Sequence, residues 1–317
     1  MILGTMNIAY PHSSNKDTQQ YSSIIHEYLN TCDDPILDSA YYYGNTETEK
    51  ILGNILTDLP SNLKLPKLTT KANPWFGNDF TTGKLGQLNK ENLLIQLNTS
   101  LENLKMDSVH RFFLHCPDYE TSIHETLETC DELWRQEKYQ EYGLSNFSLA
   151  QTQEVLQICE KNDYRKPKVY QGMYNIVCRK VEEMFPLLNE YDIDFWGYNP
   201  LAGGLLTGKY RNLKEDLPDS RFKNNSIYQN IFWKNEILQM LENLWLKNDD
   251  YLDIALLWFK QGSQMRKNDR VILGVSSVNQ YQNNMNSYNS QKNYSNIYQE
   301  FNSVYINNEK CTPNYYY

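Results

Sequence analysis

Residues 110–147, HRFFLHCPDYETSIHETLETCDELWRQEKYQEYGLSNF, contain the pattern that decides the fold class. Both ends of this stretch are short, apolar and rich in residues that favour β-strands. The middle, 119–138, has apolar residues at helical spacing. Thr121 or Ser122 can cap this helix, and Glu125 lies in its first turn. A strand, a helix and a second strand in this order predict two parallel strands joined by a crossover helix.

The same unit repeats along the 317-residue chain. Short β-rich runs recur, and segments with helical spacing separate most of them. The runs are 1–6, 35–40, 67–73, 110–116, 139–147, 168–175, 192–201 and 270–277. This number of units favours a closed (β/α)8 TIM barrel of the α/β class over an open sheet. Because no linker divides the chain, we expect a single domain that spans residues 1–317.

Composition argues against several classes of partner. The net charge of −9 disfavours nucleic acid, which attracts basic surfaces. No apolar run is long enough for a transmembrane helix or a signal peptide, so we expect no membrane association. The six cysteines form no CxxC pair, which favours a reducing, cytoplasmic compartment. HExxH is absent and the histidines do not pair at ligand spacing, so we expect no metal site.

Three polar side chains stand at the carboxyl ends of neighbouring β-rich runs: Asp38, Lys71 and His115. Each alone has an ordinary structural explanation, as a turn residue, a solvent-facing strand end or a hydrogen-bonded core histidine. Parallel strands are buried on both faces, however, and a charged group inside them costs free energy unless it is paired or used. A barrel binds and reacts at this end of its strands, so the three residues together favour a functional site.

Three consecutive tyrosines, Tyr41–Tyr43, follow Asp38 at close range. A phenol has a pKa near 10 and donates its proton poorly at neutral pH. A nearby ammonium such as that of Lys71 lowers this pKa, an aspartate can hold the lysine, and a histidine can orient an incoming carbonyl. The set predicts a general acid that protonates an oxygen as negative charge builds there, as in carbonyl reduction by hydride. The residues alone leave open which tyrosine is the acid.

Longer motifs extend this pattern over most of the chain. They are LGTM (3–6), DSAYYY (38–43), TKA (70–72), FFLHCPD (112–118), GLSNF (143–147), VYQGMYN (169–175), YNPLAGGLLTGKY (198–210) and ILGVSS (272–277). In these motifs the chain resembles the aldo-keto reductases, and among them the aflatoxin-aldehyde reductases. The resemblance implies a (β/α)8 barrel that uses NADPH to reduce aldehydes, and also dicarbonyls, in detoxification. It also implies a small-molecule substrate and a homodimer.

The resemblance assigns roles to the residues at the strand ends. The family's acid lies five residues after the aspartate, so Tyr43 is expected to donate the proton. Asp38 and Lys71 are expected to tune this tyrosine, and His115 is expected to orient the substrate carbonyl. These four residues are the tetrad. The two tyrosines before Tyr43 are assigned to packing or to the substrate pocket.

The resemblance also places the cofactor. Ser145, Asn146 and Gln171 are expected at the nicotinamide carboxamide, and Tyr198 is expected to stack on the nicotinamide ring. The other residues assigned to the cofactor are Met6, Asp38, Asn199, Pro200, Leu201, Ala202, Gly203, Gly204, Leu205, Leu206, Thr207, Gly208, Lys209, Arg221, Ser276, Ser277, Gln280 and Asn284. Within this group, the loop after the seventh run would surround the pyrophosphate, and the segment after the eighth run would meet the adenosine.

A preference for NADPH over NADH is expected at the adenosine end. Residues 276–284 begin a helix whose first N–H groups lack helical partners and attract an anion such as the 2′-phosphate. Ser276 and Ser277 add hydroxyl groups, although they also suit an ordinary helix cap. Arg221 can add a charged contact from the preceding loop. No acidic residue lies between 274 and 284 to hold the ribose hydroxyls, as NADH binding would favour.

Two positions depart from the family. Tyr317 stands where the family often has an arginine for acidic substrates, so we expect Tyr317 at the substrate and no preference for carboxylate-bearing aldehydes. Gln229 stands where the subfamily usually has a basic residue, which removes one phosphate contact. The alternatives are a cofactor-binding regulatory subunit resembling the potassium-channel β-subunits and a lyase or isomerase of phosphorylated sugars, which the tetrad disfavours.

Overall fold

The computed structural model describes the chain except for residues 10–14, 78–82, 211–221, 223–224, 247–248 and 317. Within the described residues, eight parallel strands pair in chain order, and the eighth pairs with the first to close a barrel. The strands are β1 (Ile2–Gly4), β2 (Ile36–Asp38), β3 (Lys67–Ala72), β4 (Val109–Leu114), β5 (Tyr139–Ser145), β6 (Val169–Met173), β7 (Asp194–Tyr198) and β8 (Arg270–Gly274). The predicted (β/α)8 barrel is confirmed.

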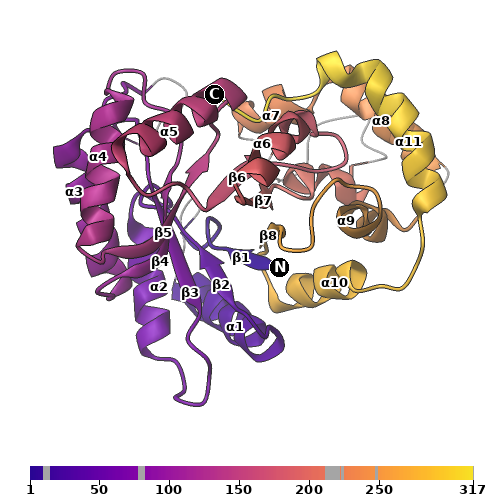
Figure 1. The fold of residues 1–317 in the computed structure, drawn as a ribbon. Helices are drawn as coiled ribbons and strands as arrows, with labels where there is room; N and C mark the ends of the chain where they lie inside the picture. Colours follow the sequence, from indigo (N-terminus) through magenta and orange to yellow (C-terminus); the bar gives the residue numbers. More distant parts are fainter. Residues whose placement is uncertain (10–14, 78–82, 211–221, 223–224, 247–248, 317) are drawn as a thin grey trace.

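Helices alternate with the strands and surround them (Figure 1). The α-helices are α1 (Asn15–Thr31), α2 (Glu47–Thr57), α3 (Lys90–Leu104), α4 (Ile123–Arg135), α5 (Leu149–Asn162), α6 (Phe185–Glu190), α7 (Ser226–Phe232), α8 (Asn235–Leu246), α9 (Tyr251–Gln261), α10 (Val278–Tyr288) and α11 (Ser295–Asn308). The short 3-10 helices are η1 (Lys180–Met184), η2 (Ala202–Thr207) and η3 (Glu309–Cys311). None of the helices described is both long enough and apolar enough to cross a membrane.

A small apolar cluster packs separately from the main hydrophobic core and draws its side chains from six strands. Its members are Ile2, Ile36, Phe113, Val169, Trp196 and Ile272. Side chains alternate between the two faces of a strand, so a barrel needs such a filling on its inner face. The Nζ atom of Lys71 lies 5.9 Å from the centroid of the Phe113 ring. The cluster therefore supports the charged groups at the carboxyl ends of the strands.

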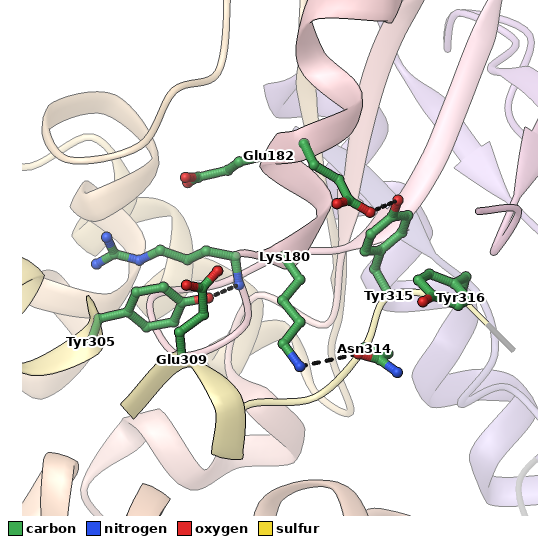
Figure 2. Close-up of a pocket in the computed structure, with 9 residues that line it drawn as sticks. Lys180, Glu182, Tyr305, Glu309, Asn314, Tyr315 and Tyr316 are labelled. Carbon is green, nitrogen blue, oxygen red and sulfur yellow. Dashed lines mark hydrogen bonds between the residues drawn. The ribbon is translucent and has the colours of Figure 1, made fainter. Parts of the chain in front are cut away.

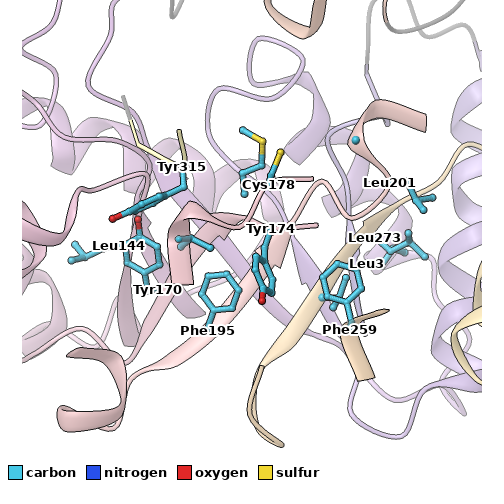
Figure 3. Packing of buried hydrophobic residues seen from close by; sticks show 14 of the residues in the cluster. Leu3, Leu144, Tyr170, Tyr174, Cys178, Phe195, Leu201, Phe259, Leu273 and Tyr315 are labelled. Carbon is cyan, nitrogen blue, oxygen red and sulfur yellow. The ribbon is translucent and has the colours of Figure 1, made fainter. Parts of the chain in front are cut away.

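A larger cluster packs the helices against the outside of the barrel (Figure 3). Phe195 of β7 is central to one part of it. Its ring centroid lies 5.4 Å from that of Tyr174 and 5.0 Å from that of Phe185, both edge-on. Burying each such aromatic ring contributes roughly 1.5–3 kcal/mol, so strands β6 and β7 are firmly held against the helices. A rigid scaffold of this kind fixes the positions of the strand ends.

The start of α4 corrects one local prediction. The helix begins after Ser122, as expected, and Glu125 lies in its first turn. The Ser122 side chain makes no capping hydrogen bond, and the Thr121 hydroxyl donates instead to Asp118 Oδ2 at 2.8 Å. The predicted cap by a side-chain hydroxyl is therefore wrong, because a carboxylate in the preceding loop binds the threonine.

Candidate active site

The carboxyl ends of β2, β3 and β4 bring three predicted residues together. Asp38 is the last residue of β2, Lys71 lies near the end of β3, and His115 follows β4 directly. These strands are neighbours in the sheet, β2 beside β3 and β3 beside β4. The backbone N–H of His115 continues the pairing by donating to Ala72 O at 2.8 Å. The parallel register therefore places the three side chains at one end of the barrel.

Asp38 and Lys71 form a buried ion pair. Lys71 Nζ lies 2.8 Å from Asp38 Oδ2, and the two side chains are 0% and 4% exposed. Nζ also donates to the backbone oxygen of Ser39 at 2.6 Å. The other carboxylate oxygen of Asp38, Oδ1, accepts from Thr69 Oγ1 at 2.9 Å and from Gln171 Nε2 at 3.0 Å. A buried ion pair is favourable only when its remaining lone pairs are satisfied in this way.

Tyr43 lies next to this pair. Lys71 Nζ is 3.4 Å from the Tyr43 hydroxyl and 4.9 Å from the centroid of its ring. Burial lowers the pKa of Lys71, but Asp38 and Tyr43 outweigh burial and raise this pKa above its usual value. Burial raises the pKa of Tyr43, and the Lys71 ammonium opposes this rise without cancelling it. The expected effect of Lys71 is present, but the net pKa of the phenol is raised rather than lowered.

The three consecutive tyrosines differ in their contacts. Tyr43 is bonded to Lys71, whereas the ring of Tyr42 packs edge-on against Trp75 at 5.2 Å between centroids. The backbone N–H of Tyr41 donates to Lys71 O at 3.1 Å, which continues the pairing of β2 with β3. Tyr43, five residues after Asp38, is therefore the tyrosine whose hydroxyl reaches Lys71.

His115 stands beside Tyr43 as a neutral ring. The two ring centroids are 5.9 Å apart, and the centroid of Trp75 lies 5.3 Å from that of His115 on another side. Burial, reinforced by the charge of Lys71, holds the pKa of His115 well below its usual value. Its Nδ1 atom is buried and has no hydrogen-bond partner among the described residues. A neutral imidazole has one N–H to donate, so His115 can offer a hydrogen bond but no ionised proton.

The residues expected at the nicotinamide form one hydrogen-bonded group beside the tetrad. Asn146 has a left-handed backbone, with φ at 62°, and its Nδ2 donates to His115 O at 2.9 Å and to Ser145 Oγ at 3.1 Å. The Tyr198 hydroxyl donates to Asn146 Oδ1 at 2.8 Å. Gln171 joins the group through its backbone oxygen, which accepts from Asn146 N at 3.3 Å, while its side-chain amide donates to Asp38 Oδ1. The barrel therefore brings together ends of β5, β6 and β7 that are distant in the sequence.

The loop after β7 has an unusual run of left-handed residues. The φ angles are 61° at Asn199, 48° at Ala202, 67° at Gly203, 95° at Gly204 and 75° at Gly208. Asn199 Oδ1 accepts from Gly203 N at 2.9 Å, which braces the turn. The N–H groups of Ala202 and Gly204 also donate within the turn, to Asn199 O at 3.0 Å and to Leu201 O at 2.8 Å, so these bonds fix its left-handed shape.

The side chains of this loop divide into two sets. Leu201, Ala202, Leu205 and Leu206 are buried in the main core, so only their backbone can face a ligand. Lys209 is exposed, and its Nζ lies 4.6 Å from the centroid of the Tyr210 ring. Its ammonium is also close to Gly204, 3.3 Å from where a Cβ would stand. A positive charge therefore lies beside the left-handed turn.

The segment predicted to meet the adenosine lies at the start of α10. Ser277 caps the helix by accepting from Gln280 N at 3.1 Å. Gln280 Oε1 accepts from the backbone N–H of Ser276 at 2.7 Å and from its hydroxyl at 2.9 Å. Asn284 is 2% exposed, and its Nδ2 has no hydrogen-bond partner among the described residues. Ser276 and Ser277 therefore stabilise the start of α10. One turn further along, Nδ2 of Asn284 is a donor with no partner among the described residues.

Two of the remaining predicted residues, Arg221 and Tyr317, lie outside the described residues. Met6 is half-buried in the turn after β1. The side-chain amide of Gln229, in α7, donates to the backbone oxygen of Phe222. Pro200 is buried at the start of the loop after β7.

Three residues of the site were missed from the sequence. Thr69 donates its hydroxyl to Asp38, and its position two residues before Lys71 in one strand is a signal that could have found it. Trp75 contacts both His115 and Tyr42 from the loop after β3. Tyr228 adds to burial in raising the pKa of Tyr43, and its ring lies against Gly203. No short-range pattern places a residue of α7 beside Tyr43.

A separate pocket of about 250 Å³ lies by the carboxyl-terminal segment (Figure 2). It is lined by Arg179, Lys180, Glu182, Glu183, Tyr305, Glu309, Asn314, Tyr315 and Tyr316, and none of the predicted site residues is among them. Lys180 Nζ donates to Asn314 Oδ1 at 3.1 Å, and the Tyr315 hydroxyl donates to Glu183 Oε1 at 2.7 Å. These bonds fasten the carboxyl-terminal segment to η1.

Comparison with known proteins agrees with this geometry. The model of the Aldo/keto reductase family matches residues 1–303. Aflatoxin B1 aldehyde reductase member 2 of Rattus norvegicus is 37% identical over 301 residues, which cover 90% of this chain and 78% of the relative. Aflatoxin B1 aldehyde reductase member 4 of Homo sapiens is 37% identical over 265 residues, 78% of each chain. A glycerol dehydrogenase from Gluconobacter oxydans shares the fold, with a TM-score of 0.76 at 20% identity over 96% of this chain and 91% of that one.

Proposed function

Because the chain belongs to the aldo/keto reductase family and is therefore an oxidoreductase, we propose that it reduces aldehydes to alcohols with NADPH, with Tyr43 as the proton donor. One observation carries the proposal. Lys71, buried and paired with Asp38, reaches the Tyr43 hydroxyl, with the neutral ring of His115 beside it. A lysine held charged against a buried phenol suits an acid that must release its proton to a developing alkoxide.

The residues around the tetrad fit a nicotinamide dinucleotide. Ser145, Asn146, Gln171 and Tyr198 would hold the nicotinamide. The ammonium of Lys209, beside the left-handed turn after β7, suits a pyrophosphate. The unpartnered Nδ2 of Asn284 suits a hydrogen-bond acceptor at the adenosine end. When bound, NADPH supplies the hydride for the carbonyl carbon.

The residues of the tetrad orient the carbonyl, donate the proton and stabilise the charge that remains. His115 donates a hydrogen bond to the carbonyl oxygen and orients it. Tyr43 gives its proton to this oxygen as negative charge builds there, because the pKa of His115 lies too low for that ring to carry a proton at neutral pH. Lys71 stabilises the phenolate that remains, and Asp38 keeps Lys71 charged and in place. His115, Tyr43 and Lys71 thus act on negative charge that develops in the transition state, whereas the Asp38–Lys71 pair is formed beforehand.

The substrate and the setting follow from the same arguments. The relatives are aldehyde reductases by name, and we propose aldehydes, with dicarbonyls as a further class, in a detoxifying role. The Trp75 ring beside His115, with the Tyr42 ring packed against it, favours uncharged substrates. All six cysteines are free thiols, which supports the reducing, cytoplasmic compartment that we propose. A homodimer is proposed from the resemblance.

The proposal is tested by mixing the protein with NADPH and 4-nitrobenzaldehyde and following the absorbance of NADPH. Consumption that depends on both the protein and the aldehyde, with formation of the alcohol, is expected. A panel of charged and uncharged aldehydes then defines the substrate class. Tight NADPH binding without turnover of any aldehyde or dicarbonyl would contradict a reductase and favour a regulatory subunit.

A further inference from the structure

Two adjacent threonines of β3 serve two different buried carboxyl groups. Thr69 Oγ1 donates to Asp38 Oδ1 at 2.9 Å, on the face of the strand that also carries Lys71. Thr70 Oγ1 donates to Glu49 Oε1 at 2.5 Å, on the opposite face. Alternation along a strand produces this division. Only one of the two threonines therefore touches the tetrad.

The two carboxyl groups have different surroundings. Asp38 accepts from a hydroxyl, an amide and an ammonium, which belong to Thr69, Gln171 and Lys71. Glu49 Oε2 is buried with no hydrogen-bond partner among the described residues, and burial raises the pKa of the Glu49 carboxyl. Donors directed at a carboxylate favour its charged form, whereas burial without them favours the neutral acid. The arrangement thus gives Asp38 three donors and leaves one oxygen of Glu49 without any among the described residues.

We propose that Thr69 is a positioning residue of the reaction, whose hydroxyl holds the Asp38 carboxylate by Oδ1 and so keeps Oδ2 facing Lys71. The inference rests on the proposed function, since it acts through the tetrad. Without this hydroxyl, Gln171 is the remaining donor on Oδ1 among the described hydrogen bonds. Gln171 is also the residue proposed to hold the nicotinamide, so its amide is shared between two tasks. Thr69 secures the carboxylate independently of the cofactor.

Several titratable groups surround Asp38 and must be considered in its pH dependence. Lys71 on β3 and Tyr43 after β2 both have a raised pKa and stay protonated at neutral pH. His115 after β4 has a lowered pKa and is neutral there, and Glu49 on α2 has a raised one. His115 can therefore contribute to a loss of rate in acid. A variant at Thr69 separates the two contributions, because its hydroxyl contacts Asp38 and not the imidazole.

The test compares Thr69→Val with Thr69→Ser and with Thr70→Val, a matched control on the opposite face of the same strand. Valine keeps the shape of threonine and removes the hydroxyl. Thr69→Val should lower kcat roughly tenfold at neutral pH, as expected for losing a hydrogen bond to a charged group, with KM little changed. Its rate should also begin to fall at a higher pH than that of the wild type. Thr69→Ser should restore both properties, and Thr70→Val should leave the pH profile unchanged.

Action through Asp38 is tested in a second background. On an Asp38→Asn protein, adding Thr69→Val should change kcat by less than about twofold, because coupled residues are not additive. An unchanged pH profile in Thr69→Val, an equal shift in Thr70→Val, or a full tenfold loss in the Asp38→Asn background would each overturn the proposal.

A measurement without cofactor or substrate separates this inference from the proposed function. Urea unfolding of the wild type and of Thr69→Val should differ most at neutral pH, and the difference should shrink in acid as the carboxylate becomes neutral. A wild type without aldehyde turnover would overturn the proposed function, while the unfolding data would still decide whether the hydroxyl holds a charged Asp38. A difference in unfolding that does not vary with pH would refute that contact.

Discussion

Replacing Lys71 by methionine should destabilise the protein and weaken its acid at the same time. Lys71 Nζ lies 2.8 Å from Asp38 Oδ2, 2.6 Å from Ser39 O and 3.4 Å from the Tyr43 hydroxyl. Methionine fills a similar volume without a charge. The buried carboxylate then keeps its neutral donors, Thr69 and Gln171, but loses its counter-charge.

The loss of stability can be estimated from this geometry. Removing one member of a buried ion pair costs about 3–5 kcal/mol, and the neutral donors that remain keep the loss near the lower end. Lys67→Met is the matched control, because Lys67 belongs to the same strand and pairs with Asp34 at 2.9 Å, with side chains 45% and 37% exposed. An exposed pair of this kind contributes less than about 1 kcal/mol.

Urea unfolding at neutral pH, followed by tryptophan fluorescence, measures both variants. The pKa of Lys71 is raised above its usual 10.5, so its contribution to stability is fully present at neutral pH and is lost only as pH rises through the higher, folded-state value. Neutral pH therefore reports the whole effect. Equal losses of stability in Lys71→Met and Lys67→Met would refute the buried ion pair as described.

Lys71→Met should also lower kcat and shift the pH profile of reduction. Burial raises the pKa of Tyr43 and Lys71 opposes that rise, so removing the ammonium raises the pKa further. The phenol becomes a weaker acid, kcat falls, and the pH profile of reduction shifts toward acid, where solvent protons assist. A variant with the wild-type rate and profile would show that Lys71 does not act on the phenol.

Two further predictions concern the cofactor end of the barrel. NADPH should bind at least roughly tenfold more tightly than NADH, because one charge-assisted hydrogen bond at the start of α10 contributes about 1.5–3 kcal/mol. Titration by quenching of tryptophan fluorescence measures both dissociation constants. Equal dissociation constants would exclude a contact to the 2′-phosphate. A non-glycine residue with a left-handed backbone costs about 1–3 kcal/mol. Gly208→Ala should lower the free energy of unfolding by more than this, because its Cβ would stand 2.2 Å from the Tyr251 ring. Gly77→Ala is the control, since its φ is 67° and no atom lies within 4 Å of the added Cβ, so it should show the backbone cost alone.

The parallel order of the strands and the alternation of side chains along each strand explain why much of the site could be predicted from the sequence. The polar residues at the ends of the β-rich runs all fall at one end of a parallel barrel, which brings Asp38, Lys71 and His115 together. Alternation along β3 also places the side chains of Thr69 and Lys71 on the same face of the strand. Ser277 at the start of α10 was predictable as a cap from its residue type and position.

Long-range contacts and burial could not be read in the same way. Gln171 bonds to Asp38 across 133 residues, and this contact exists only because the barrel closes. The net pKa of Tyr43 depends on how completely the phenol is buried, which short-range sequence does not report. The hydroxyl of Thr121 donates to the carboxylate of Asp118 and does not cap helix α4. In each case the deciding partner lies outside the local pattern.

The central claim, that Tyr43 is the acid, is tested most directly by comparing Tyr43→Phe with Tyr42→Phe. Both variants remove one phenolic oxygen, but the Tyr43 hydroxyl lies at Lys71 whereas the Tyr42 ring packs against Trp75. Single-turnover reduction of 4-nitrobenzaldehyde at saturating NADPH should fall by roughly 10²–10⁴ in Tyr43→Phe, with NADPH binding unchanged, and by far less in Tyr42→Phe. A Tyr43→Phe protein that retains the wild-type rate, with Tyr42→Phe inactive, would contradict the account.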